Sequence, residues 1–192
     1  MKPIERGEIL GLPDYEAIRG PFRARVIEEK KRRRVLVGPS VSAVFENRDT
    51  ILLQIQEMLR TERITRESAV RHEIDTYNQL MPEAGGLSAT VMIEIPDPAE
   101  RDSFLTRAKG FEKHIAIALA GERIGATWDE SRVLPDRASA VLYVKFALTP
   151  AVRAAIQAKE GDVELLVDHG EYRARAKLSR ATLDSLAEDL GT

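Results

Sequence analysis

The sequence predicts an α+β fold with a helical N-terminal half and a sheet-rich C-terminal half. Two patterns lead to this prediction. Apolar residues recur at helical spacing over residues 47–81, and from residue 87 onward they alternate with polar residues, as in half-buried strands. A stretch with turn chemistry, Pro82 to Gly86, separates the patterns. We therefore expect a helical subdomain over residues 1–82 and a sheet-rich subdomain over residues 83–192, within one compact unit.

The composition is typical of a globular chain, and 192 residues suffice to bury a sizeable core. The 29 basic and 31 acidic residues nearly cancel, which argues against binding to nucleic acid or membrane surfaces through overall charge. The chain has no cysteine, so it cannot supply disulfides, thiolate nucleophiles or iron–sulfur ligands. It shows no apolar leader and no run of 18 apolar residues, so we expect a cytoplasmic protein that does not enter membranes.

The first helix is predicted to begin at Pro13–Asp14, where Asp14 can cap it. Gly20–Pro21 is expected to interrupt or kink this helix and to start a second one over residues 22–31. A short β-hairpin follows, with strands at 35–37 and 41–45 around a turn at 38–40.

Two amphipathic segments then predict an antiparallel helical hairpin. The first, residues 47–63, carries an apolar stripe that includes Ile51, Ile55 and Leu59. The second, residues 66–81, carries Val70 and Ile74, and Pro82 stops it.

The C-terminal half contains the order strand, helix, strand, strand twice, and a closing helix follows Ser179. The first copy spans 88–95, 98–108, 113–119 and 122–128, and the second spans 139–146, 150–159, 163–168 and 171–178. Matching positions differ by 51 in the leading strands and by 50 in the hairpins. One interpretation is a duplication, which predicts a pseudo-twofold sheet with helices on one face; the other is that short amphipathic elements simply recur.

A polar segment at a strand-to-helix junction is the main candidate for a ligand site. Free backbone N–H groups there can hold an anion, although Asn47 or Asp49 could instead only cap the helix. The candidate ligand-binding residues are Glu46, Asn47, Arg48, Gln54, Glu57, Arg60 and Glu62.

A buried polar cluster is also predicted on the seam of the helical hairpin. A carboxylate on an apolar stripe must be paired, protonated or near solvent, and Glu62 lies close to the centre of such a stripe. The cluster would contain Glu62, Glu67, Arg71 and Asn78, either as a ligand site or as a structural salt bridge.

The basic run from Lys30 to Arg34 allows two interpretations. It could contact phosphates of nucleic acid, or it could be a solvated helix end whose cations complement the helix dipole. Nucleophile-elbow, Walker and dinucleotide-binding motifs do not occur in the sequence.

Several strings, taken as a set, resemble a bacterial family called domain of unknown function 3501. They are Arg33–Pro39, Phe45–Thr50, Gln54–Arg60, Tyr77–Pro82, Leu87–Thr90 and Ile93–Ile95, and together they extend the resemblance over nearly the whole chain. The family carries no activity that could be transferred. The resemblance implies a redox or peroxide-stress setting, with a rubrerythrin-like or iron–sulfur oxidoreductase-like protein as partner.

A rubrerythrin-type di-iron centre requires Glu-x-x-His pairs on one helical face. The residues three before the histidines are Ala69, Phe111 and Leu166, so the motif is absent and we expect no metal site and no cofactor. An alternative metal set of Glu57, Glu62 and His72 stays open. His114 and His169 are expected to be structural or exposed.

We therefore expect a non-enzymatic accessory protein that serves a redox or iron–sulfur partner and self-associates. The alternative is an enzyme or small-ligand binder whose site lies where the segment 46–62 meets the sheet. Nucleic-acid binding through residues 30–34 is a third, less favoured hypothesis.

Overall fold

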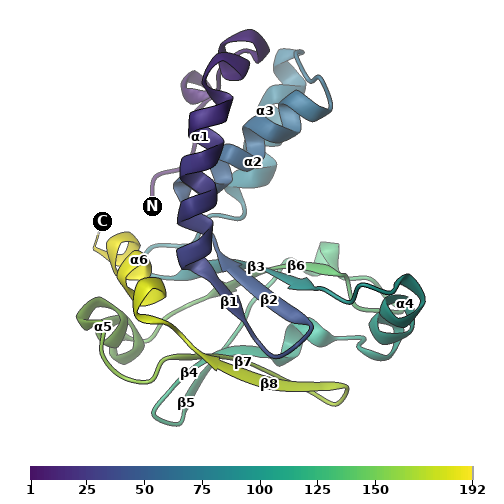
Figure 1. The fold of residues 1–192 in the computed structure, drawn as a ribbon, viewed down its shortest axis with the longest axis vertical. Coiled ribbons are helices and arrows are strands. Elements are labelled where there is room, and N and C mark those ends of the chain that lie inside the picture. The colour runs from purple at the N-terminus through teal and green to yellow at the C-terminus, as the bar shows by residue number, and fades with distance from the viewer. Residues whose placement is uncertain (192) are drawn as a thin grey trace.

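The computed structural model describes residues 1–191 and confirms the α+β class (Figure 1). Within that range the chain forms six α-helices and eight strands in two antiparallel sheets. The helices are α1 (Leu12–Arg33), α2 (Arg48–Thr61), α3 (Glu67–Asn78), α4 (Pro98–Arg107), α5 (Pro150–Ala158) and α6 (Arg180–Leu190). The strands are β1 (Arg34–Leu36), β2 (Val41–Phe45), β3 (Leu87–Ile93), β4 (Ile115–Leu119), β5 (Glu122–Gly125), β6 (Val141–Phe146), β7 (Glu164–His169) and β8 (Tyr172–Lys177).

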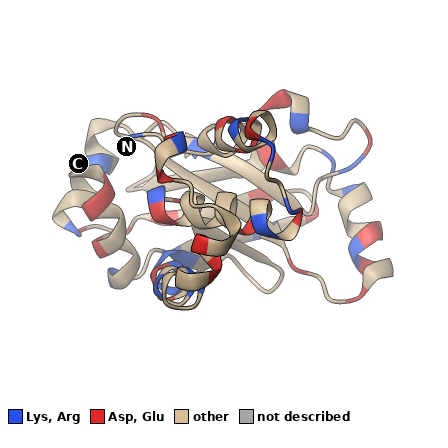
Figure 2. Ribbon diagram, turned by 90° about the horizontal axis from the view of Figure 1, so that it is seen from above, with Lys and Arg blue, Asp and Glu red and all other residues tan. Residues whose placement is uncertain are grey.

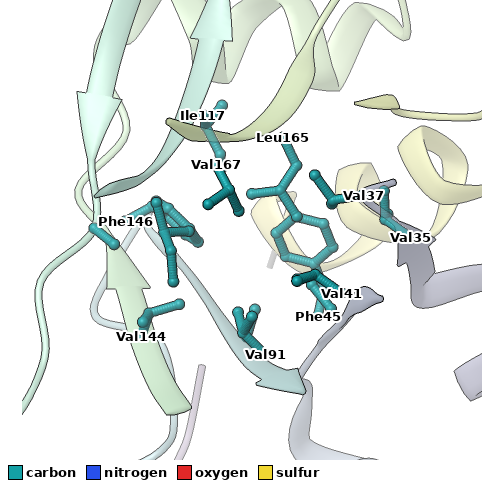
Figure 3. Close-up of a cluster of buried hydrophobic side chains, with 14 of the residues drawn as sticks. Val35, Val37, Val41, Phe45, Val91, Ile117, Val144, Phe146, Leu165 and Val167 are labelled. Atoms are coloured by element: carbon teal, nitrogen blue, oxygen red, sulfur yellow. The ribbon is translucent and has the colours of Figure 1, made fainter. Parts of the chain in front are cut away.

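The two sheets face each other across the main hydrophobic core. One sheet has the strand order β1-β2-β3-β6 and the other has the order β5-β4-β7-β8. Alternate residues of each strand point inward, so Phe45 and Phe146 from one sheet meet Ile117 and Leu165 from the other (Figure 3). All four of these side chains are almost completely buried.

The predicted interruption at Gly20–Pro21 is wrong, because α1 runs through both residues as one helix of 22 residues. Pro21 is exposed, so its missing N–H leaves no unpaired group inside the core. Tyr15 on one side of it and Val26 on the other are fully buried and hold the two halves of the helix in place.

Helices α1, α2 and α3 form an arm that rises from the first sheet (Figure 1). A second hydrophobic cluster lies inside this arm, with Ile51, Ile55 and Leu59 of α2 against Val70 and Ile74 of α3. The two apolar stripes of the sequence therefore pack against each other, as the helical-hairpin prediction requires.

The duplication hypothesis predicted one pseudo-twofold sheet. Instead, the two strand–helix–strand–strand units contribute their strands to two different sheets. Their leading strands pair with each other in one sheet (β3 with β6), and their hairpins pair through β4 and β7 in the other. The registers match the sequence offsets, because Val91 pairs with Leu142, 51 residues later, and Ala116 pairs with Leu166, 50 residues later. Each unit thus meets its counterpart about a pseudo-twofold axis that passes near these two pairs.

The main core continues across the Pro82–Gly86 stretch. The first sheet takes β1 and β2 from residues before this stretch and β3 and β6 from residues after it. The first-half residues Val35, Val41 and Phe45 belong to the same hydrophobic cluster as residues of the second half.

The surface helices carry acidic and basic residues mixed together (Figure 2). None of the helices within residues 1–191 combines the length and the apolar character needed to cross a bilayer.

Candidate functional site

Strand β6 lies at one edge of its sheet, and its outer edge is almost free of backbone partners. Lys145 exchanges two backbone hydrogen bonds of 2.8 Å with Thr127 across this edge. By the alternation of an antiparallel ladder, the backbone groups of Tyr143 and Val141 point the same way as those of Lys145. The chain reaches this edge from the other sheet, because the neighbouring Ala126 still donates its N–H to Ile115 O at 2.9 Å.

Three adjoining cavities follow this edge, and we call them together the β6 groove. The central cavity measures about 270 Å³ and is flanked by cavities of about 220 and 200 Å³. Trp128, Arg132 and Tyr143 are shared by the central cavity and the first flank, and Glu83 and Lys145 are shared with the second. Gln79 and Leu80, which follow α3, and Glu46, which follows β2, complete the central cavity.

A row of polar residues crosses the sheet beside the groove because of strand alternation. Phe45, Ala89 and Val144 lie in one row and face the core. The next row therefore faces the opposite side. It contains Glu46, whose N–H bonds to Ser88 O at 2.9 Å, then Ser88 itself, and then Lys145, which pairs with Ser88.

The Glu46 carboxylate is the most unusual group of the groove. Glu46 is only 3 % exposed, and its carboxylate accepts hydrogen bonds from the hydroxyls of Thr90, at 2.5 Å, and Thr50. Within the described chain no cation pairs with it. Burying a carboxylate without a cation is costly, so this position is suited to receive a positive group from outside the chain.

Other buried polar atoms at or near the groove also lack hydrogen-bond partners. In residues 1–191 the indole Nε1 of Trp128, the Oε1 of Glu112 and the Oγ of Ser88 form no hydrogen bond. Trp128 and Glu112 both line the groove, and Glu112 is 2 % exposed. Buried polar groups in proteins are nearly always satisfied, so such a concentration marks the groove as a place where a ligand or water would complete the bonding.

Two cations at the groove are only loosely neutralised. Lys145 Nζ lies 4.0 Å from Glu83 Oε1, and the Glu83 side chain is largely exposed. The Arg132 guanidinium lies 5.5 Å from the centre of the Tyr143 ring, and its Nε is 3.4 Å from Asp129 Oδ2. Both cations therefore remain available to an acidic group of a ligand.

Of the seven residues predicted to bind a ligand, the structure brings Glu46 alone into the groove. Asn47 caps α2, with its Oδ1 accepting from Thr50 N at 3.0 Å. Arg48 pairs with Glu8 and Arg60 pairs with Glu16. Gln54 is partly exposed on α2, and Glu62 is exposed at the end of that helix.

Glu57 joins α2 to α1. Its carboxylate accepts two hydrogen bonds of 2.8 Å from Arg19 and one of 2.7 Å from the Tyr15 hydroxyl. The bonds from Arg19, and then the bond from Tyr15, lower the pKa of Glu57 to about 2 against the opposing effect of burial. The same contact raises the pKa of Tyr15, after the larger effect of burial.

The buried polar cluster predicted on the hairpin seam does not form. Glu62, Glu67 and Arg71 are exposed, because the seam is filled by apolar side chains and these three lie outside it. Glu67 forms surface ion pairs with Arg71 and Arg6, both in the range of 2.8–2.9 Å. Asn78 instead holds the N-terminal segment through two hydrogen bonds of 2.9 Å to the backbone of Ile4.

Most cations of the basic run 30–34 form ion pairs with acidic residues of the same chain. Lys31 pairs with Glu28, Arg32 with Glu29, and Arg34 with Glu94. Arg33 is 1 % exposed and bonds to Glu29 and to Asp189 of α6 at 2.7 Å each. Burial opposes ionisation of Glu29, but hydrogen bonds from Arg33, Ser185 and Arg32 lower its pKa to about 2. Through Arg33 the run therefore ties α1 to the end of β2 and to α6, and most of its cations are paired within the chain.

The histidines stand apart from the groove. His114 and His169 contact each other edge to face, with ring centres 4.8 Å apart, and His72 is exposed on α3. Across the described chain no three histidine, aspartate or glutamate side chains are placed to hold a metal ion.

Sequence reasoning missed most of the groove, because its residues come from several segments far apart in the sequence. Arg132, Tyr143 and Lys145 looked like ordinary surface residues of the second half. The one available signal was Trp128, the single tryptophan of the chain, in a polar segment that leaves a predicted strand.

Comparison with known proteins finds relatives without an assigned activity. A family model described as "Protein of unknown function (DUF3501)" matches residues 3–190. A crystal structure of a protein of unknown function from Burkholderia pseudomallei superposes with a TM-score of 0.91 at 32% sequence identity. The match covers 98% of this chain and 100% of the other. No curated protein matches the chain.

Proposed function

Because the chain belongs to the DUF3501 family, which is described only as of unknown function, we propose a function from the groove itself: the protein binds a small molecule that carries a cationic nitrogen. The observation that carries this proposal is the buried Glu46 carboxylate, which has two hydroxyl donors and no cation. A bound ammonium or guanidinium group would supply the missing positive charge and would donate to carboxylate lone pairs that the two threonine hydroxyls leave free.

The groove walls support the same ligand chemistry. Tyr143 and Trp128 line the central cavity, and aromatic faces attract cations through their ring quadrupoles. Glu112, which lines the first flanking cavity, has an Oε1 without a hydrogen bond in the described residues, and this atom can accept a further N–H. The central volume of about 270 Å³ suits a compact metabolite rather than a large cofactor.

Binding does not require catalysis. The hydroxyls that contact the Glu46 carboxylate belong to Thr50 and Thr90, and among the described residues neither of these threonines lines the groove. The Oγ of Ser88, in the same polar row of the sheet, is buried and has no hydrogen-bond partner in the described residues, so no base activates it. We therefore propose a binding protein rather than an enzyme. The redox or iron–sulfur partner and the self-association expected from the sequence stay predictions, since nothing in the groove bears on them.

Trp128 gives a direct test, since it is the only tryptophan and it lines the groove. Purified protein is titrated with a panel of alkylamines, guanidines, diamines and amino acids while tryptophan emission and melting temperature are recorded. We expect at least one cationic compound to change the emission and to raise the melting temperature.

The matched variants are Glu46→Gln, which removes the buried charge, and Glu62→Gln, which removes an exposed charge outside the groove. Loss of the response in Glu46→Gln and its retention in Glu62→Gln would support the proposal, provided that both variants keep the native circular dichroism spectrum. A flat response across the panel, or one that Glu46→Gln retains, would refute it.

A further inference from the structure

We infer that the ligand also carries an acidic group several bonds from its cationic nitrogen, and that Arg153 and Lys145 hold this group at the Gly85–Gly86 turn. The inference rests on the proposed function, because it assigns the second end of the same groove. It narrows the ligand class from cations in general to zwitterions such as ω-amino acids or aminoalkyl phosphates.

Arg153 is the first observation. It lies on α5, is partly buried, and lines the flanking cavity of about 200 Å³. Its Nε is buried without a hydrogen-bond partner, and in residues 1–191 its guanidinium forms no ion pair. A guanidinium whose Nε is buried without an acceptor, on a residue that lines a cavity, is suited to bind a carboxylate or phosphate.

The turn at Glu83–Gly86 holds Arg153 in this position. Gly86 N bonds to Glu83 O at 2.9 Å, and Gly85 has a φ of +72°, which a type II turn requires at its third residue. A β-carbon at Gly85 would overlap the guanidinium of Arg153, and one at Gly86 would lie 2.7 Å from Phe146 O. Gly85 therefore leaves room for the guanidinium of Arg153, and Gly86 lets the turn approach the backbone of β6.

Lys145 provides the second cation and the connection to Glu46. It lines both the central cavity and the cavity that contains Arg153. Its ammonium group lies 4.0 Å from Glu83, whose exposed side chain can move away. An anion between Lys145 and Arg153 would meet two cations that no buried carboxylate neutralises.

The spacing of the strands sets the length of the ligand. Glu46 continues β2, and Lys145 lies on β6, with β3 between them. Two strand spacings amount to roughly 10 Å between these backbones. The ligand should therefore place several bonds between its two charges, unlike an α-amino acid.

The test compares five probes by Trp128 fluorescence: butylamine, 1,4-diaminobutane, 4-aminobutyrate, 6-aminohexanoate and 4-aminobutyl phosphate. At least one zwitterion should bind tenfold or more tightly than butylamine. Arg153→Met should remove most of that advantage and leave butylamine binding unchanged, because Arg153 lies outside the central cavity, and Lys145→Met should also remove most of the advantage. The exposed Arg23→Met is the charge-matched control and should behave like the native protein.

The outcomes separate the two proposals. If butylamine binds and no zwitterion binds more tightly, or if 1,4-diaminobutane binds best, the acidic subsite is refuted while the cation site survives. If the advantage persists in Arg153→Met, this residue is not the anion receptor and the inference fails. If no probe binds, the proposed function itself fails. Unchanged melting temperatures of the unliganded variants show that they are folded.

Discussion

At the scale of single residues, two glutamates show how surroundings decide a role. Glu57 has an arginine and a tyrosine as donors, which compensate its charge within the chain. Glu46 is more deeply buried and has only threonine hydroxyls. The first is therefore an internal link between α1 and α2, and the second is the residue that we propose to bind a cationic group.

Glu57 makes stability depend on pH in the acid range. The folded state lowers its pKa from 4.5 to about 2, so its stabilisation is fully present above pH 4.5 and is lost as the pH falls towards 2. We expect Glu57→Gln to lower the free energy of unfolding by about 1–2 kcal/mol at pH 7, and by less than half of that at pH 3. Urea denaturation at the two pH values measures both differences.

Glu62→Gln serves as the control for this comparison, because its side chain is exposed at the end of α2. It should leave the unfolding midpoint unchanged at either pH. An equal loss of stability for Glu57→Gln at pH 7 and pH 3 would contradict the electrostatic link.

At the scale of elements, α1 tolerates two residues that oppose helix formation. Gly20 and Pro21 lie in the middle of the helix, and both are exposed. Pro21 lacks the N–H that would bond one turn back, and Gly20 has the highest entropy cost of helix formation among ordinary residues. The helix persists because tertiary contacts on both sides outweigh these penalties.

Replacing both residues should therefore strengthen the arm. A β-carbon at Gly20 would meet no other atom within 4 Å, so alanine can be added there without strain. We expect Gly20→Ala combined with Pro21→Ala to raise the free energy of unfolding by about 1–3 kcal/mol. Thermal and urea denaturation would show this gain, and a loss of stability would mean that α1 needs its proline.

Most elements were predictable from the sequence, whereas their partners were not. Periodicity located α2, α3 and every strand of the second half, because each element buries one face of its own. The same periodicity says nothing about which strand becomes an edge. It could therefore not show that Thr127 crosses to β6, or that the unpaired carboxylate belongs to Glu46 rather than to Glu62.

At the scale of the whole molecule, the N-terminal segment breaks the symmetry of the sandwich. The two strand–helix–strand–strand units are related about the pairs Val91–Leu142 and Ala116–Leu166. Strand β2 covers the outer edge of β3, but the equivalent edge of β6 carries only the Thr127 bridge. The β6 groove thus occupies the place that the β1–β2 hairpin fills in the other unit.

The covered outer edge of β3 bears on how many ligand molecules one chain can bind. Two equivalent units would offer two equivalent sites, with the chance of cooperativity within one chain. Strand β2 already occupies the outer edge of β3, so we propose that the β1–β2 hairpin leaves no groove in the first unit. Glu46 follows β2, so the same hairpin supplies the proposed cation-binding residue of the β6 groove. Calorimetric titration with the best ligand should therefore saturate at one molecule per chain with a simple hyperbolic isotherm, and a second equivalent site would show that the hairpin does not play this part.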